Sequence, residues 1–245
     1  MHTPAALHAE QGLVATRRAT DRLGEVVAGM NDAIVHAPSR LPGWSRAHVL
    51  SHLARNADGL VNLLTWARTG VEHPMYASTA DRDADIAEGA PRLFQVHFED
   101  LVASNDRFFR SAEGLPVSAW QARVGWRVGL IEAAMVPWMR LTEVLVHLVD
   151  LGVGVRFADV VELAGGQLGP LIDYLTWTRA DGPPLWVAVE LPSGEVREWS
   201  TGSGQPGEPV QRAHGPAEAV LAWLTGRDDP EAGLVASAPE LPAWL

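Results

Sequence analysis

The sequence predicts an α+β protein, with a four-helix bundle over residues 1–153 followed by a small α+β domain over residues 154–245. Apolar residues recur with helical spacing through most of the first 153 residues, whereas strand-like alternation begins only after residue 154. The chain has 245 residues, of which 47% are hydrophobic, which is enough to build two cores.

Four helices are expected in the first part, with one long connection before the third. Their predicted spans are about 7–30, 45–69, 88–112 and 130–152. Ser45 stands at the N-cap position of the second helix, and Gly70 ends that helix. Pro137 falls inside the fourth span, where it either kinks the helix or marks its true start. Acidic residues gather between Asp81 and Asp100, and we interpret this segment as a loop that leads into a helix.

The second part mixes helices and strands. A helix is predicted at about residues 167–180, and a second at 216–224, where proline stands early and Gly226 follows the end. Between them, 185–191 and 195–201 alternate as strands around the turn 192–194, which predicts a hairpin. The Gly/Pro-rich stretch 202–209 is expected to be a loop.

Composition excludes several classes of function. The net charge of −11 argues against nucleic acid as a partner, because binding phosphates requires a basic surface. The absence of cysteine excludes disulfides, thiolate metal sites and a catalytic cysteine. No apolar run reaches the roughly 20 residues that a membrane helix needs, and the N-terminus lacks the pattern of a signal peptide. We therefore expect a soluble, cytoplasmic monomer with no membrane partner.

The fourth predicted helix carries ionisable residues on one face. Glu143 and His147 are four residues apart, and Asp150 follows three residues later, so all three share a face. The residues between them are apolar, and burying ionisable groups without partners is costly. A metal ion is a suitable partner for a carboxylate and an imidazole together. The same spacing is also common in surface or capping pairs, which is the alternative interpretation.

The second predicted helix supplies the complement. His48, His52 and Asn56 stand at spacing four, so one imidazole from this helix could join Glu143 and His147. Three protein ligands with an open fourth position are typical of catalytic zinc, although Fe(II), Ni(II) and Mn(II) suit the same donors. Asp150 could then accept a hydrogen bond from a ligating imidazole.

At these residues the chain resembles the mycothiol-dependent maleylpyruvate isomerases, within the DinB-like superfamily of metal-binding bundles. Residues 41–54 are similar to the family's Gly-Trp-Ser segment that ends in a His-Leu-Ala ligand turn, and residues 138–152 contain its Arg-x2-Glu-x3-His-x2-Asp-Leu-Gly signature. Residues 64–70, 74–76 and 223–227 extend the similarity over nearly the whole chain. The Pro-Met-Tyr stretch 74–76 favours the isomerase over its relatives.

The resemblance implies a zinc site of His52, Glu143 and His147 in a DinB-like four-helix bundle, with mycothiol as the coenzyme. It implies the cis–trans isomerisation of maleylpyruvate to fumarylpyruvate, a step in the degradation of aromatic compounds such as gentisate. Arg227 carries over as a catalytic and substrate-binding residue that would anchor substrate carboxylates. Arg82, near Tyr76, is a weaker candidate for substrate binding.

This reaction is physically reasonable for a metal-held thiol. An isolated cis double bond does not rotate, but addition of a thiolate converts it into a single bond that does, and expulsion of the thiolate restores a trans double bond. A free thiol with a pKa of about 8.5 is mostly protonated at neutral pH, whereas a metal-coordinated thiol is deprotonated. Three alternatives use the same residues: a mycothiol S-transferase, a metal-dependent hydrolase, and a non-catalytic metal-binding bundle.

Overall fold

The structure is a computed structural model that describes residues 3–126, 129–179, 184–202, 210–227, 238–239 and 241. The chain divides into two compact units, Met1–Val155 and Arg156–Leu245. The predicted α+β class is confirmed, because the first unit is mainly helical and the second combines helices with a sheet. Among the described residues, no helix has the length and apolar character needed to cross a membrane.

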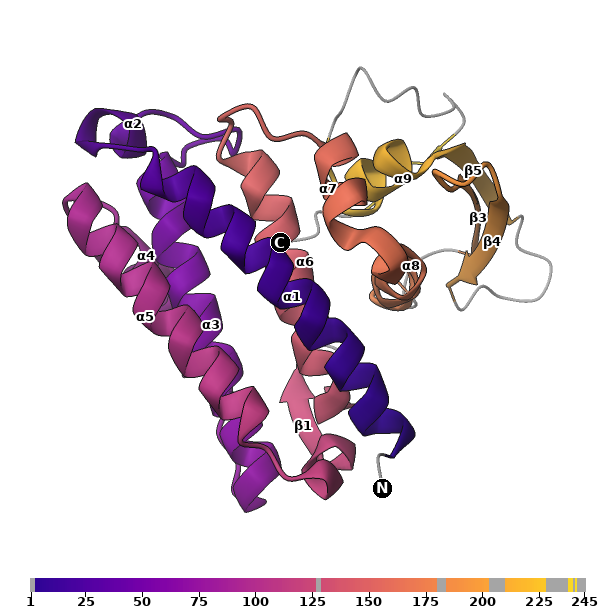
Figure 1. The fold of residues 1–245 in the computed structure, drawn as a ribbon, viewed down its shortest axis with the longest axis horizontal. Helices are drawn as coiled ribbons and strands as arrows, with labels where there is room; N and C mark the ends of the chain where they lie inside the picture. The colour runs from indigo at the N-terminus through magenta and orange to yellow at the C-terminus, as the bar shows by residue number, and fades with distance from the viewer. Residues whose placement is uncertain are drawn as a thin grey trace. The chain divides into compact units, whose positions relative to one another are not determined.

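The first unit is built on four long helices that lie alongside one another (Figure 1). These are α1 (Pro4–Ala28), α3 (Arg46–Thr69), α5 (Phe94–Glu113) and α6 (Val136–Asp150). Helix α3 packs against both α5 and α6, and α1 packs against α6, so α3 and α6 face each other inside the bundle. The predicted four-helix bundle is therefore confirmed.

The ends of the two central helices are set by local sequence. Ser45 caps α3, where its side chain accepts a hydrogen bond from the His48 backbone N–H, and Gly70 ends the helix with a positive φ of 71°. Helix α6 begins at Val136, so Pro137 marks the helix start rather than a kink. The residues just before it form a hairpin of two short strands, β1 (Arg123–Trp126) and β2 (Gly129–Glu132).

The buried face of α1 differs from the one that the largest apolar side chains alone would suggest. Leu7 and Val14 are 48% and 62% exposed, whereas Leu23 and Val27 are fully buried. Alanine fills most of the buried face of α1, including Ala9, Ala15 and Ala19. Small residues allow close approach to α6, as at Gly12, where a Cβ atom would lie 2.9 Å from Cβ of Pro137.

Two short helices were not predicted. Helix α2 (Asp32–His36) occupies the connection between α1 and α3 and is capped by Asn31. Helix α4 (Thr79–Gly89) lies in the acidic segment that the sequence suggested was a loop, and Ser78 caps it. Ile86 is buried while most of the helix is solvated, and α4 packs against α3. The interpretation of this segment as a loop before the third predicted helix was therefore wrong for residues 81–87.

The second unit contains a three-stranded sheet in the order β4-β3-β5. The predicted hairpin is present as β3 (Leu185–Glu190) and β4 (Val196–Thr201), while β5 (Gln211–Pro216) was not predicted and pairs parallel to β3. Three helices accompany the sheet: α7 (Phe157–Ala164), α8 (Leu168–Trp177) and α9 (Ala217–Leu224). The spans of α8 and α9 agree with the predicted helices, whereas α7 was missed. Of the predicted loop 202–209, residues 203–209 lie outside the described part of the chain.

Candidate metal centre

Helices α3 and α6 bring three side chains to one point. His52 from α3 and Glu143 and His147 from α6 each offer one donor atom, and these three atoms all lie within 4.8 Å of one another. Nε2 of His52 is 2.8 Å from Oε2 of Glu143, and Nε2 of His147 is 3.3 Å from the same oxygen. Both imidazoles therefore direct Nε2 at a single carboxylate oxygen.

Asp150 holds the ring of His147 from the other side. Oδ2 of Asp150 lies 2.8 Å from Nδ1 of His147, and both side chains are buried. A carboxylate at this place favours a proton on Nδ1, so Nε2 is the ring atom available to a metal ion. The shared face that the spacing of Glu143, His147 and Asp150 predicted is present, with Asp150 behind the three-donor cluster.

The protonation states suit metal binding at two of the three donors. Burial lowers the pKa of His52 to about 4, so its imidazole is neutral at pH 7. Burial alone would raise the pKa of Glu143, but hydrogen bonds with His147 and His52 hold it well below its ordinary value. Burial likewise lowers the pKa of His147, yet hydrogen bonds with Asp150 and Glu143 outweigh burial and raise it. A metal ion at the cluster would therefore compete with a proton on His147.

The donor set fits a divalent metal ion. Two imidazole nitrogens and one carboxylate oxygen are the ligands of many catalytic zinc sites that keep one position open. Without a metal ion, the hydrogen bond to ionised Glu143 places the proton of the neutral His52 ring on Nε2. Nδ1 of His52 is buried and has no hydrogen-bond partner among the described residues. The Glu143 side chain keeps 13% exposure, compared with 2% and 3% for the two histidines. The carboxylate is thus the donor nearest to solvent.

His48 has a different role from His52, although both were candidate ligands before the family resemblance was considered. Its Nδ1 lies 3.2 Å from the backbone nitrogen of Ser45 and 2.8 Å from the Ser45 hydroxyl, which completes a capping box at the start of α3. The Trp44 ring stacks on His48, and its centroid lies 5.8 Å from that of His52. Trp44 therefore packs against the cluster as well as against His48.

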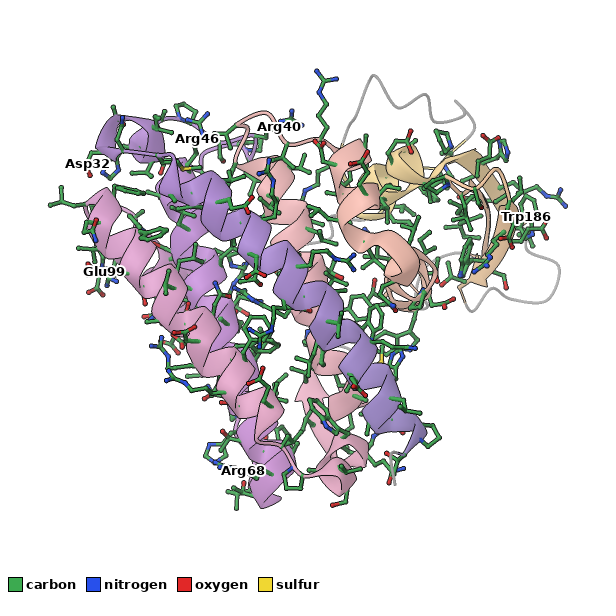
Figure 2. All side chains as sticks on the ribbon, viewed as in Figure 1. Asp32, Arg40, Arg46, Arg68, Glu99 and Trp186 are labelled. Atoms are coloured by element: carbon green, nitrogen blue, oxygen red, sulfur yellow. The ribbon has the colours of Figure 1, made fainter. Side chains whose placement is uncertain are left out.

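Arg46 fixes the start of α3 to the end of α6. Its guanidinium donates to the backbone oxygens of Leu151 and Gly152 at 2.6 and 3.2 Å, and also to that of Ile34 at 3.1 Å. A cation is favourable at a helix C-terminus, where backbone carbonyls lack partners within the helix. Figure 2 shows Arg46 at the end of the bundle where α2 lies, with Arg68 at the opposite end of α3.

A buried polar network beside the cluster was not predicted as functional. Arg140, one turn before Glu143, is completely buried and donates to Oδ1 of Asn56 at 2.8 Å and to Oδ1 of Asn105 at 2.7 Å. Asn56 stands one turn after His52, and its side chain also interacts with the Tyr76 hydroxyl. The spacing of four between His52 and Asn56 indicated that Asn56 shares a helix face with His52. It did not indicate the partner of Asn56, Arg140, which lies 84 residues away in the sequence.

The two predicted substrate-binding arginines lie in different units. The guanidinium of Arg82, in α4, lies over the Tyr76 ring at 6.0 Å from its centroid, and its charge contributes to lowering the pKa of His52. The Arg82 side chain is 19% exposed, and its contact with Asp83 is long, at 3.7 Å. Arg227 follows α9 in the second unit and donates to the backbone oxygen of Thr225 at 2.6 Å. The roles of both arginines in substrate binding stay predictions.

Comparisons with known proteins identify one family model and two crystal structures that are similar to this chain. A family model described as the mycothiol maleylpyruvate isomerase N-terminal domain matches residues 16–152. A crystal structure of the mycothiol-dependent maleylpyruvate isomerase is 28% identical with a TM-score of 0.81, and the match covers 96% of this chain and 97% of that one. A variant of that enzyme with one histidine replaced by alanine is 27% identical with a TM-score of 0.80, at the same coverage. A search of curated proteins found no match.

Proposed function

The chain belongs to the mycothiol maleylpyruvate isomerase family, and we propose that it catalyses the zinc- and mycothiol-dependent cis–trans isomerisation of maleylpyruvate to fumarylpyruvate. The observation that carries the proposal is the convergence of His52, Glu143 and His147 within 4.8 Å, in a chain similar to such an isomerase over 96% of its length. A cytoplasmic location and a role in the degradation of aromatic compounds remain part of this proposal.

His52, Glu143 and His147 would hold the metal. His52 is already neutral at pH 7, and Glu143 is already ionised, so neither needs to lose a proton for binding. Asp150 would keep the Nδ1 proton of His147 and raise the basicity of Nε2. When bound, zinc would lower the pKa of a thiol that coordinates it, so that the thiol is deprotonated at neutral pH.

The protein must also stabilise the negative charge of the substrate. Maleylpyruvate carries two carboxylates, and its conjugated carbonyl oxygen gains negative charge while the former double bond is single. That charge returns to the double bond when the thiolate leaves, so no proton is gained or lost overall. Arg82 supports the proposal as a cation beside Tyr76 and close enough to affect His52. We propose that Arg82 and Arg227 bind the carboxylates, with Arg227 also acting as a catalytic residue.

The experiment follows maleylpyruvate absorbance with zinc-loaded protein, with and without mycothiol at a concentration far below that of the substrate. The proposal expects many turnovers per thiol and none without it. Consumption of one thiol per substrate would instead identify an S-transferase, in which the adduct is not released. Turnover without thiol would identify a hydrolase, and no turnover with zinc bound would support a non-catalytic metal-binding bundle.

A further inference from the structure

Arg140 sets the orientation of a side chain next to the candidate metal centre. The guanidinium is completely buried and donates from Nη1 to Oδ1 of Asn56 at 2.8 Å and to the backbone oxygen of Leu53 at 2.9 Å. Arginine has donors only, so the Asn56 atom that faces it must be the amide oxygen. The amide NH2 of Asn56 is therefore the part of that side chain left for other partners.

The direction of the next hydrogen bond follows from this assignment. The Asn56 side chain lies close enough to the hydroxyl of Tyr76 for a hydrogen-bonding interaction, and only its NH2 group is left to make it. The Tyr76 oxygen therefore accepts this bond, and its own hydrogen is free to be donated elsewhere. Aligned donors polarise one another, so the chain from Arg140 through Asn56 makes the Tyr76 hydroxyl a better donor.

The backbone around Tyr76 is held against α3. A Cβ atom on Gly59 would lie 2.7 Å from Cγ of Met75, 2.9 Å from its backbone oxygen and 3.3 Å from Cε1 of Tyr76, so only glycine allows this approach. The side-chain amide of Asn62, one turn further, donates to the backbone oxygens of Pro74 and Met75 at 3.4 Å. The loop that carries Tyr76 is thus fixed on the same helix that presents His52.

We propose that Tyr76 is a catalytic residue that donates a hydrogen bond to the substrate oxygen on which negative charge accumulates, and that Arg140 and Asn56 are positioning residues that aim its hydroxyl. The proposal rests on the proposed isomerase function. The Tyr76 side chain is only partly buried, and its hydroxyl interacts with Asn56, which follows His52 by one turn of α3. Burial, with the charge of Glu143, raises the pKa of Tyr76, so the hydroxyl keeps its proton.

The first test is Tyr76→Phe, which removes the hydroxyl and keeps the ring that packs near Gly59 and below Arg82. We expect kcat to fall about 100-fold, the usual effect of losing one donor to a developing oxyanion. Zinc stoichiometry and mycothiol affinity, measured by calorimetry, should stay at the wild-type values. The control is Tyr174→Phe, the same change at the chain's other tyrosine, in α8, which should leave kcat unchanged.

A double-mutant cycle tests the positioning role. Asn56→Asp keeps an acceptor for Arg140 but replaces the amide donor with a second acceptor, which would draw the Tyr76 hydrogen toward itself. We expect kcat to fall as in Tyr76→Phe, and the double variant to be no slower than Tyr76→Phe alone. In the metal-free protein, Tyr76→Phe should shift the NMR signals of the Asn56 side-chain amide and leave those of Asn105 in place.

The results of these experiments distinguish an error in the role of Tyr76 from an error in the proposed isomerase function. If wild-type protein isomerises maleylpyruvate and Tyr76→Phe retains its full kcat, the inference is wrong while the proposed function stands. If the two losses multiply in the double variant, or the Asn56 amide signals do not move, the positioning role is wrong. Absence of thiol-dependent isomerisation by the wild-type protein would overturn the proposed function and this inference together.

Discussion

Oδ2 of Asp150 lies 2.8 Å from Nδ1 of His147, on the side of the ring opposite the atom that faces Glu143. Asp150→Asn should weaken zinc binding by about 10- to 100-fold, because the imidazole loses the carboxylate that holds its tautomer and increases its basicity. Competition with a chromophoric chelator measures the affinity. Asp106→Asn makes the same change at an exposed position of α5 and should have no effect. Equal zinc affinity in both variants would contradict this role of Asp150.

Removal of either imidazole of the cluster should abolish stoichiometric metal. His52→Ala and His147→Ala each leave two protein donors, which is too few for a tightly held catalytic zinc ion. His48→Ala is the matched control on α3, because His48 belongs to the capping box. It should lower the free energy of unfolding by about 1 kcal/mol and keep the metal. Metal analysis after dialysis measures the zinc content per protein. Full zinc occupancy in His52→Ala would show that the ligand set is wrong.

The metal-free protein should lose stability as pH falls from 6.5 toward 4. The folded-state pKa of His52 is about 4, below its unfolded value of 6.5, so in this range only the unfolded state takes up the proton. The loss from this residue is about 3 kcal/mol across that range. His147 has the opposite sign: its raised pKa stabilises the fold below pH 6.5, and that contribution disappears as pH rises through the folded-state value.

Urea unfolding of metal-free wild-type protein and His52→Gln at several pH values measures this difference. The variant lacks the titrating group, so its free energy of unfolding should decline less between pH 6.5 and 4 than that of the wild type. Parallel profiles for the two proteins would mean that His52 is not held neutral by burial.

A pair of glycine substitutions tests how the Tyr76 segment is held. Gly59→Ala places a Cβ atom 2.9 Å from the backbone oxygen of Met75, so the segment must shift, at a cost of about 1–3 kcal/mol. The shift should also lower kcat, because it displaces Tyr76. Gly24→Ala in α1 meets no atom within 4 Å among the described residues and should stabilise the fold by about 0.5–1 kcal/mol. Calorimetric unfolding should show that the free energy of unfolding rises in Gly24→Ala and falls in Gly59→Ala. A lower value in Gly24→Ala, or an unchanged value in Gly59→Ala, would contradict these expectations.

Local patterns were sufficient to predict the long helices and part of the candidate site. Glu143, His147 and Asp150 share one helical face whatever surrounds them, so spacing alone placed them together. Ser45 and Gly70 gave the ends of α3 for the same reason, because a cap acts on backbone within a few residues. The choice of His52 over His48 needed the family resemblance, since both stand at helical spacing.

Features that depend on distant partners could not be predicted in this way. Strand β5 pairs parallel to β3, and its sequence from Gln211 to Pro216 lacks a strong strand pattern on its own. The buried guanidinium of Arg140 donates to Asn56 and Asn105, which come from two other helices. The buried face of α1 is mostly alanine while Leu7 and Val14 are exposed, because close packing of α1 against α6 requires small side chains.

One kinetic measurement tests most directly whether the metal centre carries a thiol-dependent isomerisation. It compares zinc-loaded and metal-free protein, with mycothiol at about one hundredth of the maleylpyruvate concentration. We expect the zinc-loaded protein to convert maleylpyruvate to fumarylpyruvate until equilibrium is reached, with the thiol recovered unchanged. We expect no conversion when either zinc or thiol is left out. Equal conversion by metal-free and zinc-loaded protein would contradict the assignment of His52, Glu143 and His147 as the centre of the reaction.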